Sequence, residues 1–137
     1  EAVMEYLLER HNPHNLILMG SSLGSGVVID YVSKYIWNTP IILISPYKSI
    51  LRIIYDMWWP FDKFKTIDKL STIFCPVKIV HGSDDKLIDL SHAEYICRSF
   101  TFNNFRPSWI YGAGHDDIPD SVKESAIKEV LKYLGYP

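Results

Sequence analysis

The stretch Asn15-Leu-Ile-Leu-Met-Gly-Ser-Ser-Leu-Gly-Ser-Gly26 decides the fold that this sequence predicts. Residues 15–19 form a continuous apolar run, which is typical of a strand that is buried on both faces. A Gly/Ser cluster follows at once, and from Ser25 to about Ile36 the apolar residues recur at helical spacing. A strand that turns directly into a helix is the first half of a strand-helix-strand unit.

The rest of the chain continues this alternation. A short helix is predicted from Glu1 to about Glu9, and the Asn12-Pro13 pair ends its pattern. Apolar runs predict further strands at Ile41–Ile44, Pro76–Val80 and Pro107–Tyr111, and helical spacing predicts helices from about Ser49 to Trp58, Leu90 to Phe100 and Ser121 to Leu134. Strands joined by helices pair in parallel, so we predict an α/β fold of about four parallel strands with flanking helices.

Composition and charge limit the classes of protein and partner. With 137 residues the chain is expected to form a single domain, 1–137, or part of one. The net charge of −2 lacks the basic character of a nucleic-acid binder. Cys75 and Cys97 have no zinc-site spacing and fit a reducing compartment, so we expect a cytoplasmic protein. No apolar run reaches the roughly 20 residues that span a bilayer.

Three clusters of unusual residues follow three of the predicted strands. They are Gly20–Gly24, Gly82–Asp85 and Gly112–Asp117. Parallel strands all point the same way, and the chemistry of α/β sheets gathers at their carboxyl ends. We therefore expect these three loops to converge on one rim of the sheet although they lie far apart in the sequence.

The first cluster has the pattern of a nucleophile elbow. Gly20-Ser21-Ser22-Leu23-Gly24 reads G-x-S-x-G between a strand and a helix, which makes Ser22 the candidate nucleophile. Side chains at positions 20 and 24 are expected to collide with neighbouring backbone. The backbone N–H of Leu23 is expected to form half of an oxyanion hole, with the other half coming from an earlier loop.

The other two clusters supply the partners that such a serine needs. A serine hydroxyl needs a base and the base needs an orienting carboxylate, in the chain order Ser, Asp or Glu, His. We predict that Asp85 is the acid and His115 the base, and Asp84 is the alternative acid. His81 is expected to pack at the end of its strand. Catalysis by such a triad requires only water, so neither a cofactor nor a metal ion is predicted.

Other interpretations of these residues are weaker. A metal site could use five ligand-type residues without a recognised ligand spacing: His81, Asp84, Asp85, His115 and Asp116. The glycines fit no nucleotide-binding pattern. His11, His14 and His92 are expected at the surface, and Asp116 and Asp117 are expected to shape their loop or cap the last helix. Trp58 and Trp59 are candidates to line an acyl pocket, and simple packing is the alternative for them.

With these residues identified, the chain resembles the alpha/beta-hydrolase superfamily, and within it the abhydrolase-domain branch that includes protein depalmitoylases. The stretches that carry the resemblance are Ile17-Leu-Met-Gly-Ser-Ser-Leu-Gly24, Ser45-Pro46, Phe61-Asp-Lys-Phe-Lys-Thr-Ile-Asp-Lys-Leu70, Cys75-Pro-Val-Lys-Ile-Val-His-Gly-Ser-Asp-Asp-Lys-Leu-Ile-Asp-Leu-Ser-His92 and Gly112-Ala-Gly-His-Asp-Asp117. The family's H-G-x-x-D pattern places the acid at Asp85, and its G-A-G-H pattern places the base at His115.

The resemblance implies an eight-stranded sheet of which this chain holds the last four strands. We therefore expect an incomplete domain that lacks the second oxyanion donor and a lipidated N-terminal segment able to associate with a membrane surface. The first strand is expected to have an open apolar edge, which favours pairing with the missing half or with a second copy.

The resemblance also directs the expected function. It implies a serine esterase or thioesterase that removes palmitate from proteins through an acyl-enzyme. A lipase or carboxylesterase acting on lysophospholipid or monoacylglycerol is the alternative enzyme. A hydrolase-fold binding module or an inactive fragment is the alternative outside catalysis.

Overall fold

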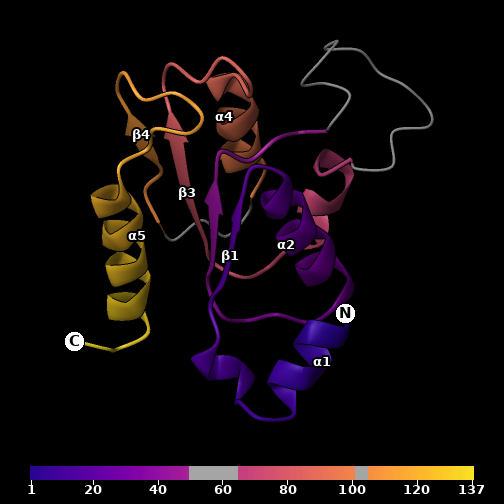
Figure 1. Ribbon diagram of the computed structural model, residues 1–137. Helices are drawn as coiled ribbons and strands as arrows, with labels where there is room; N and C mark the ends of the chain where they lie inside the picture. Colours follow the sequence, from indigo (N-terminus) through magenta and orange to yellow (C-terminus); the bar gives the residue numbers. More distant parts are fainter. Residues whose placement is uncertain (50–64, 101–104) are drawn as a thin grey trace.

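The computed structural model describes residues 1–49, 65–100 and 105–137, and these form a parallel sheet with helices on both faces (Figure 1). The strands are β1 (Leu18–Ser21), β2 (Ile41–Ile44), β3 (Val77–Gly82) and β4 (Ser108–Ile110), and they lie side by side in that order. The helices are α1 (Ala2–Leu8), α2 (Leu23–Lys34), α4 (Leu90–Ser99) and α5 (Asp120–Tyr133), with short 3-10 turns η1 (Pro13–Asn15) and η2 (Ile67–Thr72). The predicted four parallel strands with flanking helices are confirmed.

The first strand is displaced from its predicted position. It begins at Leu18 and not at Asn15, because the Asn12 side chain accepts a hydrogen bond from the His14 amide at 3.0 Å and holds 13–15 in a 3-10 turn. It ends at Ser21, two residues beyond the apolar run. The predicted helix from Ser49 to Trp58 lies almost wholly outside the described residues, which resume at Lys65.

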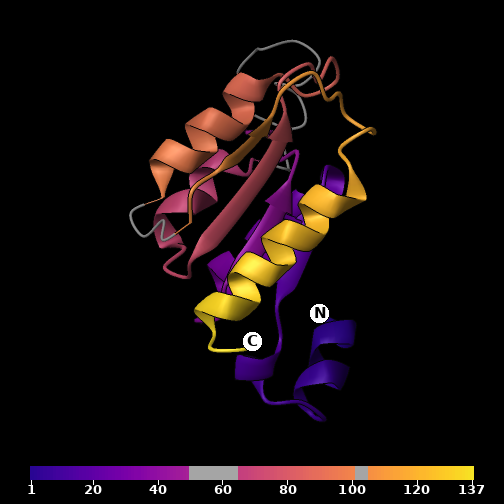
Figure 2. The same ribbon diagram turned by 90° about the vertical axis from the view of Figure 1, so that its left-hand side faces the viewer.

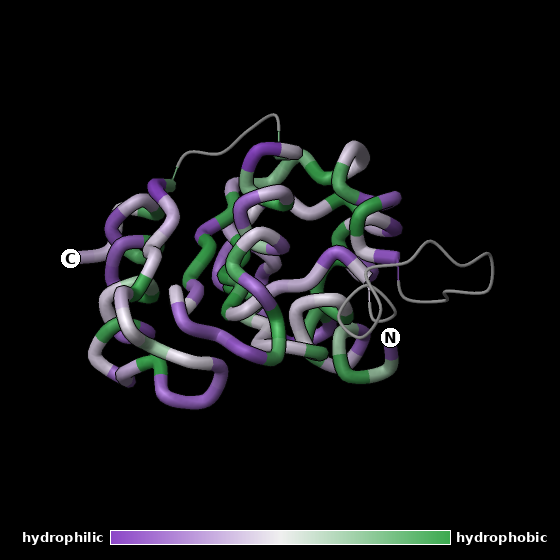
Figure 3. The backbone as a smooth tube through the Cα atoms, turned by 90° about the horizontal axis from the view of Figure 1, so that it is seen from above, coloured by the Kyte–Doolittle hydropathy of each residue, from purple (hydrophilic) through white to green (hydrophobic). Residues whose placement is uncertain are grey.

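Two hydrophobic cores hold the helices against the sheet, and Figure 2 shows α5 lying across one face of it. On one face α2, η2 and α4 pack against alternate strand residues such as Leu43 and Ile79. On the other face α5 packs through Ala126 and Val130 against Ile42, Ile44 and Val80. All four residues of β2 are buried, as predicted for a strand covered on both faces. Figure 3 views the molecule along the strands, with α5 on the opposite side of the sheet from α2.

A buried lysine ties α5 to the sheet. Lys78 lies in the middle of β3 with 3% of its surface exposed. Its Nζ donates to the Arg106 carbonyl at 2.7 Å and forms an ion pair with Glu129 of α5. A buried ammonium group is tolerated only when it is paired in this way.

The two ends of the undescribed segment 50–64 lie next to each other. Ser49 and Lys65 form an isolated antiparallel bridge, and the Ile67 amide donates to the Lys48 carbonyl at 3.0 Å. The Lys48 amide in turn donates to Nδ1 of His92 on α4 at 3.3 Å. His92 is buried, so its predicted surface position is wrong.

Two further features concern the exterior. Within the described parts of the chain, no helix is both long and apolar enough to cross a membrane. Among the same residues β1 is an edge strand that pairs with β2 alone, and its Met19 is half exposed.

Candidate active site

Ser22 occupies a strained turn between β1 and α2. Its φ of 50° lies in the left-handed region that non-glycine residues rarely adopt. The Ser22 amide donates to the Ile44 carbonyl of β2 at 2.8 Å, which anchors the turn to the sheet. A Cβ atom at Gly20 would lie 2.4 Å from the Gly24 carbonyl oxygen, so this close turn requires glycine there.

The prediction of a collision at Gly24 is wrong. No atom of the described residues lies within 4 Å of a Cβ built at that position. Gly20 packs closely against the backbone of Gly24, but a side chain added at Gly24 itself would point into open space.

Asp85 is buried directly beyond β3. Its Oδ1 accepts hydrogen bonds from the amides of Leu87 at 2.9 Å and Ile88 at 2.8 Å. Its Oδ2 faces the imidazole of His115, with Oδ2 to Nδ1 at 2.7 Å. None of the Asp85 side-chain surface is exposed, so these donors replace the water that a carboxylate otherwise binds.

His115 joins the buried acid to the serine. A carboxylate accepts only, so His115 Nδ1 carries the proton that Asp85 binds. Its Nε2 is then free to accept a proton, and it lies 2.9 Å from Ser22 Oγ. The structure thus brings the three predicted residues Ser22, His115 and Asp85 into one chain of hydrogen bonds, at the carboxyl ends of β1, β4 and β3.

The loops that carry the acid and the base are joined to each other. The Ser83 amide donates to the Ile110 carbonyl, the Asp84 amide donates to the Ala113 carbonyl, and the Gly112 amide donates to Ser83 Oγ, each at 2.9 Å. A Cβ atom at Gly82 would lie 2.2 Å from the Ala113 carbonyl oxygen. This close approach sets the separation between the two loops.

The neighbouring acidic residues have other partners. Asp84 is exposed and accepts a hydrogen bond from Ser83 Oγ at 2.8 Å, so the structure does not bring this alternative acid to His115. Asp117 accepts from the Gly114 amide and shapes the His115 loop, as predicted. Neither Asp116 nor Asp117 caps the last helix, because the N-cap position is Pro119.

Two buried residues beside the site were not predicted to take part in it. Ser45 follows β2 with a φ of 46°, and its Oγ has no hydrogen-bond partner among the described residues. His81 is fully buried, and its Nε2 lies 2.8 Å from the Ile88 carbonyl oxygen. For Ser45, the pair Ser45-Pro46 at the end of an apolar run is a signal that could have been found in the sequence. For His81, no local sequence pattern reveals the contacts that its ring makes.

The predicted oxyanion donor begins a helix. Leu23 is the first residue of α2, where an amide has no acceptor within its own helix. Its side chain is exposed at the same rim of the sheet. Trp58 and Trp59, the candidates for an acyl pocket, lie outside the described residues.

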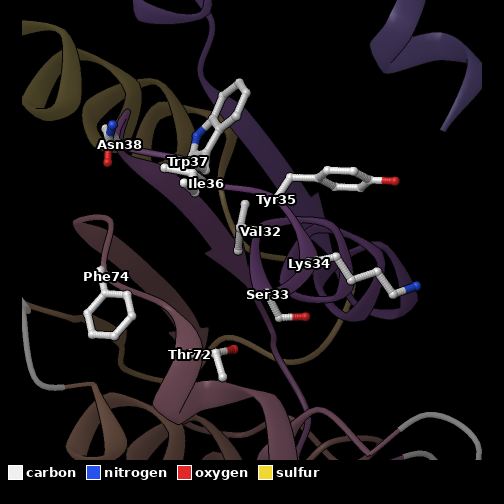
Figure 4. Close-up of a pocket in the computed structure, with 9 residues that line it drawn as sticks. All are labelled: Val32, Ser33, Lys34, Tyr35, Ile36, Trp37, Asn38, Thr72 and Phe74. Carbon is white, nitrogen blue, oxygen red and sulfur yellow. The ribbon is translucent and has the colours of Figure 1, made fainter.

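A pocket of about 220 Å³ lies away from the triad (Figure 4). It is formed where α2 ends and where η2 leads into β3, close to the amino-terminal end of β2. The nine lining residues are Val32, Ser33, Lys34, Tyr35, Ile36, Trp37, Asn38, Thr72 and Phe74. No group of three or more His, Cys, Asp or Glu side chains in residues 1–49, 65–100 and 105–137 is arranged to hold a metal ion.

Comparison with curated proteins finds related sequences. The chain is 43% identical over 138 residues to a protein of Acanthamoeba polyphaga mimivirus described as an alpha/beta hydrolase, covering 98% of this chain and 52% of that protein. It is 37% identical over 110 residues to the human alpha/beta hydrolase domain-containing protein 17C, covering 78% of this chain and 33% of that protein. The chain therefore spans about half the length of the viral relative and a third of the human one. No family model matches the chain.

Solved structures share the fold at low sequence identity. An esterase domain from a Rhodothermus marinus protein has a TM-score of 0.71 at 14% identity, covering 98% of this chain and 66% of that one. The monoacylglycerol lipase of Paleococcus ferrophilus has a TM-score of 0.67 at 15% identity, covering 99% of this chain and 74% of that one.

Proposed function

Because the chain belongs to the alpha/beta-hydrolase superfamily, we propose that it is the C-terminal part of a serine hydrolase domain that cleaves an acyl ester or thioester. The observation that carries this proposal is the chain of hydrogen bonds from Ser22 Oγ through His115 to the buried Asp85. These are the residue types, the order and the atoms that nucleophilic acyl transfer requires.

The mechanism follows from those atoms. Ser22 Oγ attacks the acyl carbonyl carbon while His115 Nε2 takes the hydroxyl proton. Asp85 holds His115 with Nε2 facing the serine and stabilises the imidazolium that forms. His115 then gives the proton to the departing alcohol or thiol, which leaves an acyl group on Ser22. Water, activated by the same imidazole, releases the acid.

The negative charge on the attacked oxygen needs two donors. The Leu23 amide at the start of α2 is the first, because it lies next to Ser22 and has no partner in its helix. The second is expected from a segment before residue 1, which belongs to the longer domain that the relatives suggest. Loss of one such donor costs on the order of 10²–10³ in rate, so the 137-residue chain alone should turn over slowly.

For the substrate we propose an S-palmitoylated protein held at a membrane surface. The support is the resemblance to the depalmitoylase branch, together with similarity to alpha/beta hydrolase domain-containing proteins 17B and 17C. Residues upstream of this chain would make the membrane contact. A lysophospholipid or monoacylglycerol ester is the alternative substrate, because a triad alone does not select the acyl donor.

The test is labelling with a fluorophosphonate probe in the full-length protein. Ser22→Ala should abolish labelling, while the neighbouring Ser21→Ala variant should label like the unaltered protein. Labelling that persists in Ser22→Ala would contradict the mechanism. Absence of labelling in well-folded unaltered protein would favour a binding module. Rates on an S-palmitoyl peptide, monoacylglycerol and lysophospholipid then separate the substrate classes.

A further inference from the structure

His81 is a second histidine that lies close to the Asp85 carboxylate. It lies on β3 four residues before Asp85 and is 0% exposed. Its Nε2 lies 2.8 Å from the Ile88 carbonyl oxygen and 3.4 Å from Asp85 Oδ2. Oδ2 is the same oxygen that accepts the proton of His115 Nδ1.

The partners of His81 fix its protonation state. A carbonyl oxygen accepts only, so Nε2 must carry the proton that Ile88 binds. Burial lowers the pKa of His81, which keeps the ring neutral. Its Nδ1 then holds a buried lone pair that has no partner among the described residues. A leucine or phenylalanine at this place would leave no such unpaired acceptor, so packing alone is a poor explanation for a histidine.

The contact stabilises the turn that surrounds the acid. Ile88 donates its amide to Asp85 Oδ1 and offers its carbonyl to His81 Nε2. The backbone of one residue is therefore held by the acid at one end and by His81 at the other. The positive end of the His81 N–H bond also lies near Oδ2, where it opposes rotation of the carboxylate away from His115.

We propose that His81 is a positioning residue that fixes the Asp85 carboxylate for its contact with His115, an inference that rests on the proposed serine hydrolase function. The group required is a neutral N–H donor at the place of Nε2. The imidazole ring as such is not required.

The test compares three variants in the full-length protein with p-nitrophenyl octanoate as substrate. In His81→Gln the amide nitrogen reaches the place of Nε2, and in His81→Asn it reaches only the place of Nδ1. His81→Phe keeps the ring shape without a donor. A displacement of about 1 Å at a catalytic group can cost on the order of 10² in rate. We expect kcat to fall at least about tenfold in His81→Asn and His81→Phe, with KM nearly unchanged. In His81→Gln we expect kcat to stay within about threefold of the value of the unaltered protein.

Controls separate the possible outcomes. The folded fraction of each variant is measured by near-ultraviolet circular dichroism, and Ser22→Ala gives the background rate. Three outcomes would each overturn the positioning role. They are equal losses of kcat in His81→Gln and His81→Asn, losses of kcat that the unfolded fraction explains, and failure of all three variants to fold. If Phe alone fails to fold, the Gln and Asn pair still decides. Activity that survives Ser22→Ala would refute the proposed function itself.

Discussion

Replacing Gly82 by alanine tests whether the separation of the Asp85 loop and the His115 loop controls activity. The added Cβ would lie 2.2 Å from the Ala113 carbonyl oxygen, whereas such contacts in proteins stay above 3.0 Å. The His115 loop must therefore move by at least 0.8 Å relative to β3. Because about 1 Å of misplacement can cost on the order of 10² in rate, we expect kcat to fall roughly a hundredfold in Gly82→Ala.

The matched control is Gly114→Ala in the same loop. There the new Cβ would lie 3.4 Å from Asp117 Oδ1, which is ordinary contact, so kcat should stay within about threefold of the unaltered protein. Both variants are assayed in the full-length protein with p-nitrophenyl octanoate, and their folded fractions are compared by circular dichroism. If Gly82→Ala is folded and as active as Gly114→Ala, the close approach of the loops does not position His115.

Three further predictions concern single side chains. Asp85→Asn should lower kcat by a factor of about 10⁴, because the amide favours the wrong tautomer of the His115 imidazole. Asp84→Asn should leave kcat within about twofold of that of the unaltered protein, because the structure does not bring Asp84 to His115. Equal effects of the two substitutions would contradict the assignment of Asp85 as the acid. Burial raises the pKa of the Cys75 thiol from 9.0 to about 11, so above pH 9 the thiol ionises more readily in the unfolded chain than in the folded one. The free energy of unfolding should therefore fall between pH 9 and 11 by up to about 3 kcal/mol relative to the Cys75→Ala variant, as measured by urea denaturation. Glu129→Gln should lower the free energy of unfolding by about 1–2 kcal/mol, because it removes the ion pair with the buried Lys78. The loss is smaller than for a fully buried pair, since Glu129 is partly exposed and Lys78 still donates a hydrogen bond to the Arg106 carbonyl. An unchanged urea midpoint would contradict this.

The parts of the fold that follow from burial were predictable from sequence. Ile41–Ile44 was predicted to the residue, because four apolar residues between a proline and a polar turn have no alternative pairing that buries both faces. β1 was misplaced at both ends, because its last residues are Gly20 and Ser21, which an apolar pattern does not recognise as strand. The convergence of Ser22, Asp85 and His115 followed from parallel topology alone.

What the sequence could not give depends on contacts between distant segments. His92 is buried, and its ring nitrogen accepts a hydrogen bond from the amide of Lys48, 44 residues earlier in the chain. The open space at Gly24 and the collision at Gly82 look alike in the sequence, since both are glycines in small motifs, and only the neighbouring backbone distinguishes them. His81 likewise shows its relation to Asp85 only in the structure, where its Nε2 lies 3.4 Å from Asp85 Oδ2 and 2.8 Å from the Ile88 carbonyl oxygen.

The bridge between Ser49 and Lys65 also affects how this fold can evolve. Because the two ends of the intervening segment are fixed side by side, an insertion or exchange between them leaves the register of β2 and β3 unchanged. Changes of sequence between these two points can therefore accumulate without displacing Ser22, Asp85 or His115 on the sheet.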